Sequence, residues 1–363
     1  MKAKRILLAA VCLMLVSAGG ERQIQGAFKK PGKPSGVMAA AVKRNIVLSF
    51  VKGKKGSGTE IYLYDKNKKK YVKKAVTKAS RYVIKGLKPG INYSFKARSY
   101  RIYKKRKYYS GFTKAVKVSM AAKGESTIKN FLKTAVAPVG STLYIWGGGW
   151  NKADTGTGTD GKRIGLNGEW NRFFLSQNSR YNYKKYRYQR GKGLDCSGFV
   201  GWAVYNIRNT VPGKGGYVRK AKDQPKLFAK KGWGKYKSKR KVTDYKAGDI
   251  MGSSSCGHVW IVIGACRDGS VVLVHSSPKG VQISGTATPG GKKKSQALAL
   301  ARKYMKKYHR RWYKRYPDCS RGKSYLTQYG QMRWDVSGSR IMEDPEGYQK
   351  KSAEAILKDI YEN

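Results

Sequence analysis

Cys196 is the residue whose setting most favours covalent chemistry. It lies between Asp195 and Ser197, two short polar residues of the kind that begin helices. From Phe199 onward, apolar residues recur at helical spacing as far as Ile207. A thiol in the first turn of a helix lies beside unpaired N–H groups and the positive end of the helix dipole, which stabilise a thiolate. The spacing therefore indicates a readily ionised nucleophile, and a cysteine that only fills a core is the alternative.

Two of the three histidines are placed to serve such a thiol. His258 opens one apolar run, and His275 closes the next. Both runs predict buried strands, and Asp268-Gly269 between them predicts a hairpin turn. Antiparallel pairing brings the start of one strand beside the end of the other, so we expect His258 and His275 to be neighbours. One ring would then take the proton of Cys196 while the other orients it.

Five short motifs around these residues resemble the NlpC/P60 family of cell-wall cysteine peptidases, in that family's order. They are Tyr144-Ile-Trp-Gly-Gly-Gly149, Leu194-Asp-Cys-Ser-Gly-Phe-Val200, Lys246-Ala-Gly-Asp-Ile250, His258-Val-Trp-Ile-Val-Ile-Gly264 and Val274-His275. The resemblance covers approximately residues 127–285. It implies an α+β papain-like domain with a Cys-His-His triad, in which Cys196 is the nucleophile, His258 the base and His275 the orienting group.

The same resemblance implies a substrate and its binding residues. Tyr144 would lie over the nucleophile near the oxyanion, and Asp195 and Ser197 would help to hold the amino end of the substrate peptide. The implied substrate is the peptidoglycan stem peptide, cleaved between γ-D-glutamate and the diamino acid. An N-acetylmuramoyl-L-alanine amidase uses the same thiol chemistry and is the nearest enzymatic alternative. No cofactor is expected, and no metal site, because no Cys/His cluster has zinc-ligand spacing.

The charge of the chain predicts a polyanionic partner. Its 363 residues include 78 Lys and Arg against 20 Asp and Glu, a net charge of +58. Residues 1–18 have a basic start, an apolar run and the small-residue site Val16-Ser-Ala18, which predict a secretory signal. No later segment has the length of a transmembrane helix. We therefore expect a secreted, wall-associated protein that binds teichoic-acid-like polymers, and no nucleic acid, since the sequence contains no recognised binding motif for it.

Residues 35–120 predict an all-β domain that precedes the peptidase domain. About seven short alternating runs, separated by turn residues, predict an antiparallel sandwich. The segment Gly86–Arg98 resembles the E–F corner of a fibronectin type III module, with Tyr93 as its packed tyrosine. Such a module identifies a fold and not a function.

The charge of this sandwich favours adhesion. Between Lys29 and Val118 there are 27 Lys and Arg residues, against the two acids Glu60 and Asp65. This excess is far greater than solubility requires, so we expect the module to hold the protein to an anionic wall. A solvated, self-repelling surface is the alternative. If the cysteine domain had lost its activity, the whole chain would be a non-catalytic basic adhesin.

The remaining boundaries complete the predicted organisation. Residues 19–34 and 121–126 are expected to be linkers, and residues 127–363 to form the peptidase domain with a C-terminal extension. Residues 151–192 make the chain longer than the compact family pattern, and we interpret them as an insertion that walls the substrate cleft. A helix predicted over residues 295–314 would place His309 on the surface. The spacing of the cysteines demands no disulfide, and the pairing of Cys319 stays open.

Overall fold

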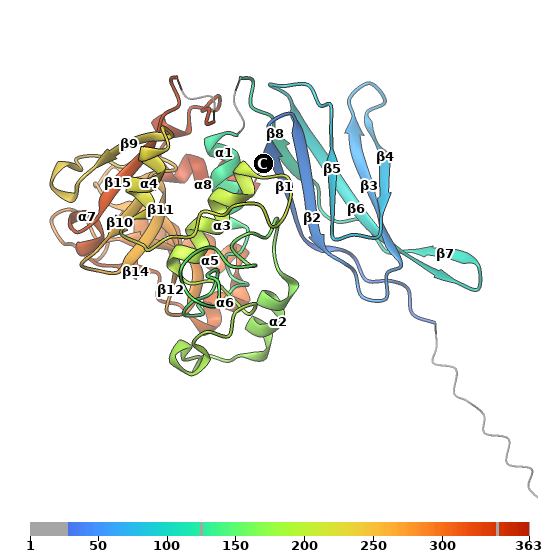
Figure 1. Cartoon of the computed structure of the whole chain (residues 1–363), viewed down its shortest axis with the longest axis horizontal. Coiled ribbons are helices and arrows are strands. Elements are labelled where there is room, and N and C mark those ends of the chain that lie inside the picture. Colours follow the sequence, from blue (N-terminus) through green and yellow to red (C-terminus); the bar gives the residue numbers. More distant parts are fainter. Residues whose placement is uncertain (1–27, 124–125, 339–340, 363) are drawn as a thin grey trace, which may run out of the picture.

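The computed structural model describes residues 28–123, 126–338 and 341–362, in which a β-sandwich is followed by a mixed α+β region (Figure 1). The predicted signal at residues 1–18 lies outside these ranges. Within them, none of the helices combines the length and the apolar character that crossing a membrane would need.

The sandwich has a three-stranded sheet in the order β1-β2-β5 and a five-stranded sheet in which β4-β3-β6-β7 is extended by β8 beside β6. Its strands are β1 (Ser35–Val42), β2 (Asn45–Val51), β3 (Gly58–Asp65), β4 (Lys70–Thr77), β5 (Arg81–Ile84), β6 (Asn92–Tyr103), β7 (Arg106–Tyr109) and β8 (Val116–Ser119). The run predicted as one strand over residues 107–118 is in fact two strands, because β7 pairs with the end of β6 and β8 with its beginning.

The predicted tyrosine corner is present in the sandwich. The Tyr93 hydroxyl accepts a hydrogen bond from the Lys88 backbone N–H at 2.9 Å and donates to the Lys88 carbonyl at 3.2 Å. Between the sheets lies a small apolar core that includes Ile46, Leu48 and Phe95. Alternation along the strands therefore buries one face of each sheet, as the sequence pattern predicts.

The α+β region is built on a seven-stranded sheet in the order β14-β13-β12-β11-β10-β15-β9, with only β13 and β14 parallel in the described part of the chain. Its strands are β9 (Gly234–Lys237), β10 (Ile250–Ser253), β11 (His258–Ala265), β12 (Val271–Ser277), β13 (Gly280–Thr286), β14 (Ser320–Arg321) and β15 (Gly330–Trp334). Its helices are α1 (Ile128–Val136), α2 (Gly168–Ser176), α3 (Cys196–Arg208), α4 (Gln224–Lys230), α5 (Gln296–Tyr308), α6 (Arg310–Arg315), α7 (Ser324–Thr327) and α8 (Ala353–Glu362), with short 3-10 turns at Tyr183–Tyr186, Lys239–Lys241 and Tyr348–Lys350.

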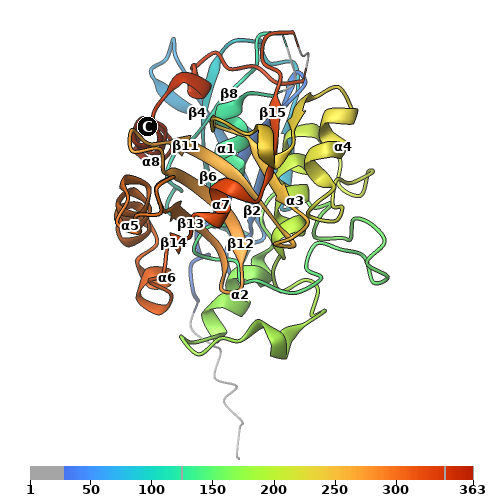
Figure 2. The ribbon, with the colours of Figure 1, turned by 90° about the vertical axis from the view of Figure 1, so that its left-hand side faces the viewer.

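Both faces of β11 are buried, but in different cores. Val259 and Ile261 pack into the large core together with α1, α3, α5 and α8. Trp260 faces the other way, into a smaller core beside Leu326 and Tyr329. Helices α5, α6 and α8 lie side by side along one flank of the sheet (Figure 2). The alternation fixes which side chains of β11 and β12 share a face, and thereby where the two histidines point.

The helix predicted over residues 295–314 is interrupted at His309, where α5 ends and α6 begins. His309 is not the surface helix residue that the sequence predicted. Its ring packs at Gly140, where any Cβ would collide with it, and its Nε2 lies 3.0 Å from the Tyr361 hydroxyl. Burial lowers the pKa of His309 to about 4. Tertiary contacts with Gly140 and Tyr361 therefore partly bury His309, although the basic residues around it predicted that it would be exposed to solvent.

The sandwich packs directly on the α+β region. Met38 of β1 is part of the large core, and Val47 of β2 is buried with Ile164 and Tyr205. In the predicted linker, the backbone N–H groups of residues 122 and 123 donate to the carboxylate of Glu343. The two parts are therefore held by apolar burial as well as by polar contacts at the junction.

Candidate active site

Asp195 caps α3 and ties it to the glycine turn at residues 147–149. Its backbone is extended, and its carboxylate accepts from Gly198 N at 2.7 Å, Ser197 Oγ at 2.8 Å and Gly147 N at 3.1 Å. Burial raises the pKa of Asp195 to about 7, although these three donors lower it. The aspartate thus does the work of an N-cap and also fixes the turn that precedes the helix.

The motif Tyr144–Gly149 forms a tight glycine turn and contains no paired strand. Leu143 forms only isolated bridges, to Gly193 and Gly280, and the chain then turns tightly. A Cβ at Gly198 would overlap the Gly148 carbonyl, so the turn can rest on the first turn of α3 only because glycine is present there. Close backbone contact, rather than strand pairing, positions this motif.

Cys196 is the first residue of α3, and 7% of its surface is exposed. Its Sγ lies 3.9 Å from the Gly257 carbonyl oxygen, and the backbone N–H of Val259 also hydrogen-bonds to it. The thiol therefore meets the chain on both sides of His258. Among the described residues, the hydrogen bonds of this sulfur run to backbone groups and not to an imidazole.

The expectation of a readily ionised thiol is wrong for this state of the protein. Burial raises the pKa of Cys196 to about 12, and the charge of Asp195 raises it further. The N–H groups at the helix start lower the pKa, as the sequence argument anticipated, but they do not outweigh burial. The helix terminus was correctly identified, and the desolvation of the sulfur was not visible in the sequence.

The predicted neighbourhood of the two histidines is confirmed. His258 Nε2 lies 3.0 Å from His275 Nδ1, with the ring planes inclined at 71°. Both rings lie with Tyr325 on the face of the sheet that Trp260 occupies. Burial lowers the pKa of His258 to about 3 and that of His275 well below its ordinary value, and the positive charge of Arg321 adds to both effects. Both imidazoles are therefore neutral here.

Cys196 opens onto a cleft of about 380 Å³. The cleft is lined by all three predicted substrate-binding residues and by several aromatic and basic side chains: Tyr144, Trp146, Trp150, Asp154, Asp195, Ser197, Lys220 and Lys222 among them. Gly257 also lines it, whereas His258 and His275 are not among its lining residues. The structure thus brings the predicted residues together as two groups, one that lines the cleft and one formed by the linked histidine rings.

Tyr144 and Ser197 have defined partners within the cleft. The Tyr144 ring meets Tyr183 edge-on at 5.2 Å, and burial, with the charge of Asp195 nearby, raises the pKa of its phenol. The phenol is therefore a permanent hydrogen-bond donor. Ser197 Oγ accepts from the Trp150 indole at 3.0 Å while it donates to Asp195, so its hydroxyl is engaged within the protein.

The segment over residues 151–192 is an ordered part of the fold. It contains α2, in which Trp170 and Phe174 are buried in the large core. Only Asp154 of this segment lines the cleft, where Arg190 Nη2 lies 2.5 Å from its carboxylate. The predicted role as a cleft wall therefore falls to the beginning of the segment, and most of it packs against the core.

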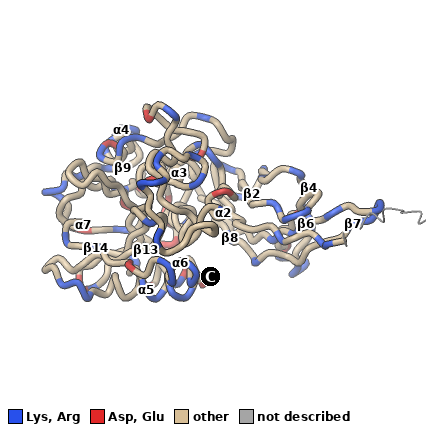
Figure 3. Tube along the Cα trace, turned by 90° about the horizontal axis from the view of Figure 1, so that it is seen from below, with Lys and Arg blue, Asp and Glu red and all other residues tan. Residues whose placement is uncertain are grey.

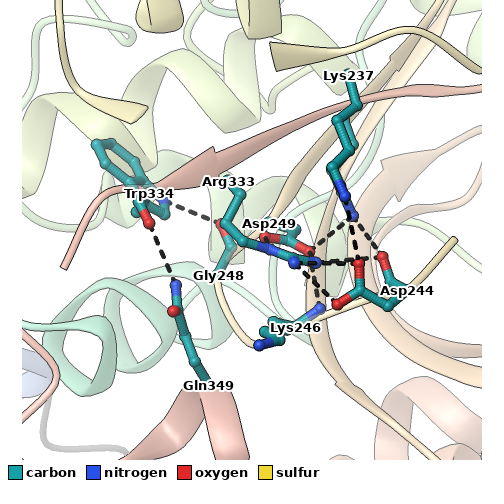
Figure 4. Close-up of polar contacts among 9 residues, drawn as sticks. Lys237, Asp244, Lys246, Gly248, Asp249, Arg333, Trp334 and Gln349 are labelled. Carbon is teal, nitrogen blue, oxygen red and sulfur yellow. Dashed lines mark hydrogen bonds and ion pairs between the residues drawn. The ribbon is translucent and has the colours of Figure 1, made fainter. Parts of the chain in front are cut away.

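The motif Lys246–Ile250 has a structural role, which Figure 4 shows. The buried Asp249 carboxylate accepts from Lys246 N at 2.7 Å and from Gln331 Nε2 at 2.9 Å. It also pairs with Arg333 of β15, whose Nη2 lies 2.8 Å away. Burial raises the pKa of Asp249 to about 6 and Arg333 lowers it, so the carboxylate is ionised at neutral pH. This cluster holds β10 beside β15. Because β11 pairs with β10, the cluster also supports the strand that begins with His258.

Sequence reasoning missed two residues that bond to His275 and one that bonds to Ser197 in the cleft. Ser284 and Arg321 hydrogen-bond to His275, and Trp150 hydrogen-bonds to Ser197. Ser284 and Arg321 belong to β13 and β14, which pair in parallel. No local motif marks them, because they reach the site only through sheet pairing across a long stretch of chain.

Comparisons with known proteins bear on the sandwich. No protein-family model and no curated protein matches the chain. Among solved structures, FN3tt is 20% identical, with 26% of this chain and 99% of that chain covered at a TM-score of 0.23. The FN5 domain of Drosophila Lar is 21% identical, with 25% and 97% covered at 0.21. A β-1,2-glucanase from Parabacteroides distasonis is 18% identical, with 30% and 15% covered at 0.23.

These similarities concern fold alone. Scores this low add nothing to the two-sheet arrangement that the strand pairing already describes. The likeness is to fibronectin type III β-sandwiches, and it extends over about a quarter of the chain. The described residues thus form a two-sheet β-sandwich joined to a mixed α+β region that holds a cysteine cleft.

Proposed function

We propose that this protein is a secreted peptidoglycan hydrolase of the NlpC/P60 type, with a papain-like catalytic domain that cleaves an amide bond of the stem peptide. The observation that carries the proposal is the position of Cys196. It begins a capped helix, opens onto a 380 Å³ cleft and contacts the strand that carries His258, whose ring lies 3.0 Å from His275. A cysteine that contacts the strand bearing one of two linked imidazoles suits acyl transfer.

The proposed reaction begins when Cys196 Sγ attacks the carbonyl carbon of the scissile amide. The thiol proton passes to His258, and the Tyr144 hydroxyl donates to the developing oxyanion. The tetrahedral intermediate collapses, the C–N bond breaks, and His258 returns the proton to the leaving amine. Water then adds to the thioester, which restores the thiol and releases a carboxylic acid. Since the thiol is neutral at rest, its proton must leave as the attack occurs.

The lining of the cleft supports a peptide substrate that carries carboxylates. Lys220 and Lys222 are at its rim, and Trp146 is 42% exposed there with the Arg187 guanidinium 5.0 Å from its ring. Cations at a partly desolvated rim favour carboxylates, and an exposed indole offers a flat surface to sugar or peptide. The peptidoglycan stem peptide supplies carboxylates for the lysines, and the peptide with its attached sugar supplies a surface for the indole.

The basic surface supports attachment to an anionic wall. Lys and Arg are distributed along the sandwich as well as the α+β region (Figure 3). Glu60 is only 2% exposed and is paired with Arg98 at 2.9 Å, so it does not offset this surface charge. Contacts with wall polymers would then form through release of counterions, a process that depends on salt.

Cys196→Ala is the decisive variant. Purified peptidoglycan is incubated with the full chain, and the released fragments are analysed by mass spectrometry. Fragment release by the wild type, its loss in Cys196→Ala and its retention in the matched control Cys256→Ala would support the proposal. Continued release by Cys196→Ala overturns it. Fragments cut between γ-D-glutamate and the diamino acid indicate an endopeptidase. Fragments in which the amide between muramic acid and L-alanine has been cut indicate an amidase.

One observation favours a second candidate, the non-catalytic basic adhesin. The cleft contains the thiol but neither imidazole, and the thiol has a pKa of about 12. A protein that only binds the wall would release no fragments in any variant, and it would bind insoluble peptidoglycan equally well with or without Cys196. The same experiment therefore separates the two candidates.

A further inference from the structure

The side of His275 that faces away from His258 is held by two residues from neighbouring strands. Arg321 Nε of β14 donates to His275 Nε2 at 3.2 Å. Ser284 Oγ of β13 lies 3.1 Å from the same nitrogen. His275 is fully buried, and Arg321 is largely so, with 14% of its side chain exposed. Both ring nitrogens of His275 are thus engaged, and Arg321 determines which one bears the hydrogen.

A guanidinium can donate hydrogen bonds but can never accept one. His275 Nε2 must therefore be the acceptor, and the single hydrogen of the neutral ring resides on Nδ1. That hydrogen points to His258 Nε2, 3.0 Å away. His258 Nε2 is then an acceptor as well, so the hydrogen of a neutral His258 resides on its own Nδ1.

A second set of contacts gives Ser284 the same polarity. Gln282 Nε2 donates to Ser284 Oγ at 3.0 Å and to the Asp318 carbonyl oxygen, while its Oε1 accepts from the Trp312 indole. The indole can only donate, which fixes the orientation of the Gln282 amide. Ser284 Oγ thus accepts from Gln282. Because His275 Nε2 is an acceptor, the Ser284 hydroxyl donates to it and shares the lone pair of that nitrogen with Arg321.

We propose that Arg321 is a positioning residue that holds the proposed base in its proton-donating form and so restrains ionisation of Cys196. This inference rests on the proposed function. A His258 that bears a hydrogen on Nδ1 and accepts the His275 hydrogen at Nε2 cannot take the thiol proton, because neither ring nitrogen has a free lone pair. It becomes able to do so only when the histidine pair reverses, with His258 Nε2–H donating to His275 Nδ1 and His275 Nε2–H donating to an acceptor.

Reversal requires the guanidinium to leave His275 Nε2, and the surroundings allow it. Arg321 lines an adjoining cavity of about 430 Å³, and Asp318 offers it a carboxylate 3.6 Å from Nη1. The titratable and charged groups that face His275 are His258 of β11, Arg321 of β14 and Tyr325 of α7, with Asp318 beyond the arginine. Of these, only Arg321 has a permanent positive charge.

The first test reads the hydrogens directly. Full-length protein with ¹⁵N-labelled histidine is examined by long-range ¹H–¹⁵N NMR, and His309→Gln and His275→Gln variants assign the rings. We expect wild-type His275 to show a protonated Nδ1 and a bare Nε2, and Arg321→Met to show a mixture of tautomers. A wild-type His275 protonated at Nε2, or a pattern unchanged in Arg321→Met, overturns the proposal. The wild-type spectrum tests the tautomer even if Arg321→Met does not fold, and the alkylation of Arg321→Lys then tests the role of the arginine.

The second test follows the thiol. Alkylation of Cys196 by iodoacetamide is measured as a function of pH by mass spectrometry of its peptide. We expect Arg321→Met to react faster than the wild type at pH 8, by about tenfold for each unit by which the thiol pKa falls. Arg321→Lys retains the charge and should stay close to the wild type. Arg315→Met removes an arginine from the same cavity, one that bonds to the Phe174 carbonyl, and should have no effect.

Equal alkylation rates in wild type and Arg321→Met would refute the restraint on the thiol. Failure of this inference and failure of the proposed function give different results, because the tautomers and the release of peptidoglycan fragments are measured separately. Correct tautomers without any release of peptidoglycan fragments leave the role of Arg321 standing and remove the hydrolase. Fragment release together with the opposite tautomer removes the role of Arg321 alone.

Discussion

The thiol of Cys196 shows how two physical effects compete at one atom. The N–H groups at the start of α3 favour the thiolate, and burial with Asp195 nearby opposes it. Burial prevails because a first-turn dipole is worth only about 0.3–2 kcal/mol, whereas desolvation of a charge costs several kcal/mol. The resting cleft therefore holds Cys196 as a neutral thiol.

Alkylation measured against pH checks this directly. At pH 8 we expect iodoacetamide to modify the exposed Cys256 well before the buried Cys196. The rate at Cys196 should continue to rise with pH beyond pH 10, because its pKa is about 12 and the thiolate fraction grows until that value is reached. Peptide mass spectrometry gives both rates in one sample, with Cys256→Ser as control. A plateau of the Cys196 rate near pH 7 would contradict the burial argument.

The sequence predicted part of this site and not the rest, for physical reasons. His258 and His275 flank one hairpin, so local pairing rules were enough to place them together. Asp195 predicted the start of α3, because a short carboxylate side chain is a preferred N-cap. Arg321 and Ser284 come from strands that fold back after long intervals, and the desolvation of Cys196 is a property of the packed whole. Neither can be read from spacing.

Among the secondary-structure elements, β10 and β15 are joined by a buried ionic cluster that keeps β11 in place. Asp249 has no exposed surface and depends on Arg333 to offset its charge. Removing one partner of a buried pair leaves the other uncompensated, which is costly, whereas an exposed pair contributes little. The motif that suggested a family likeness thus acts here as a structural tie.

Arg333→Met should lower the free energy of unfolding by about 3–5 kcal/mol. Lys237→Met, which removes only a half-exposed contact 3.8 Å from Asp244, should cost less than about 1 kcal/mol. Urea denaturation of the two variants beside the wild type gives both values. Equal losses would show that the cluster does not depend on burial.

The hairpins of the sandwich use lysine where glycine or asparagine is usual. In the described part of the sandwich, every non-glycine residue with a positive φ is a lysine: Lys43, Lys55, Lys69, Lys104 and Lys105. A side chain in the left-handed region costs about 1–2 kcal/mol. The fold carries this cost at its most exposed turns, and each of these positions displays a cation there.

Lys69→Gly should therefore stabilise the protein by up to about 1 kcal/mol. Lys66→Gly is the matched control, since it removes an equally exposed charge from the same turn at a position with ordinary φ, and it should not stabilise. Differential scanning calorimetry measures both. Stabilisation by both variants would point to charge repulsion instead of backbone strain.

For the molecule as a whole, the sandwich and the α+β region act as one packed body with a common charge. Met38 enters the large core, so the sandwich is also part of the support for α1 and α3. Removing it would disturb the fold, and surface substitutions are the sounder way to test attachment. The alternating strand pattern predicted the sandwich, but no local sequence feature predicted that Met38 of β1 would contribute to the core of the α+β region.

Wall binding should weaken steeply as salt increases, because counterion release drives it. A triple variant with Lys66, Lys68 and Lys69 changed to Gln should bind less tightly at 50 mM salt and show a shallower dependence on salt concentration. Sedimentation with purified walls measures both, and turnover of soluble muropeptides should be unchanged. An unaltered salt slope would place the attachment surface elsewhere.

The partners of the two acidic residues in the sandwich bear on how attachment to a wall would respond to pH. Glu60 is buried against Arg98, and Asp65 accepts from the backbone of its own turn. The sequence between Lys29 and Val118 contains no histidine. We therefore expect the proposed attachment through this module to depend chiefly on ionic strength, while Asp195, with a pKa of about 7, makes the cleft sensitive to acidity. For the proposed hydrolase, we expect a drop in external pH to change the rate of bond cleavage more than it changes attachment to the wall.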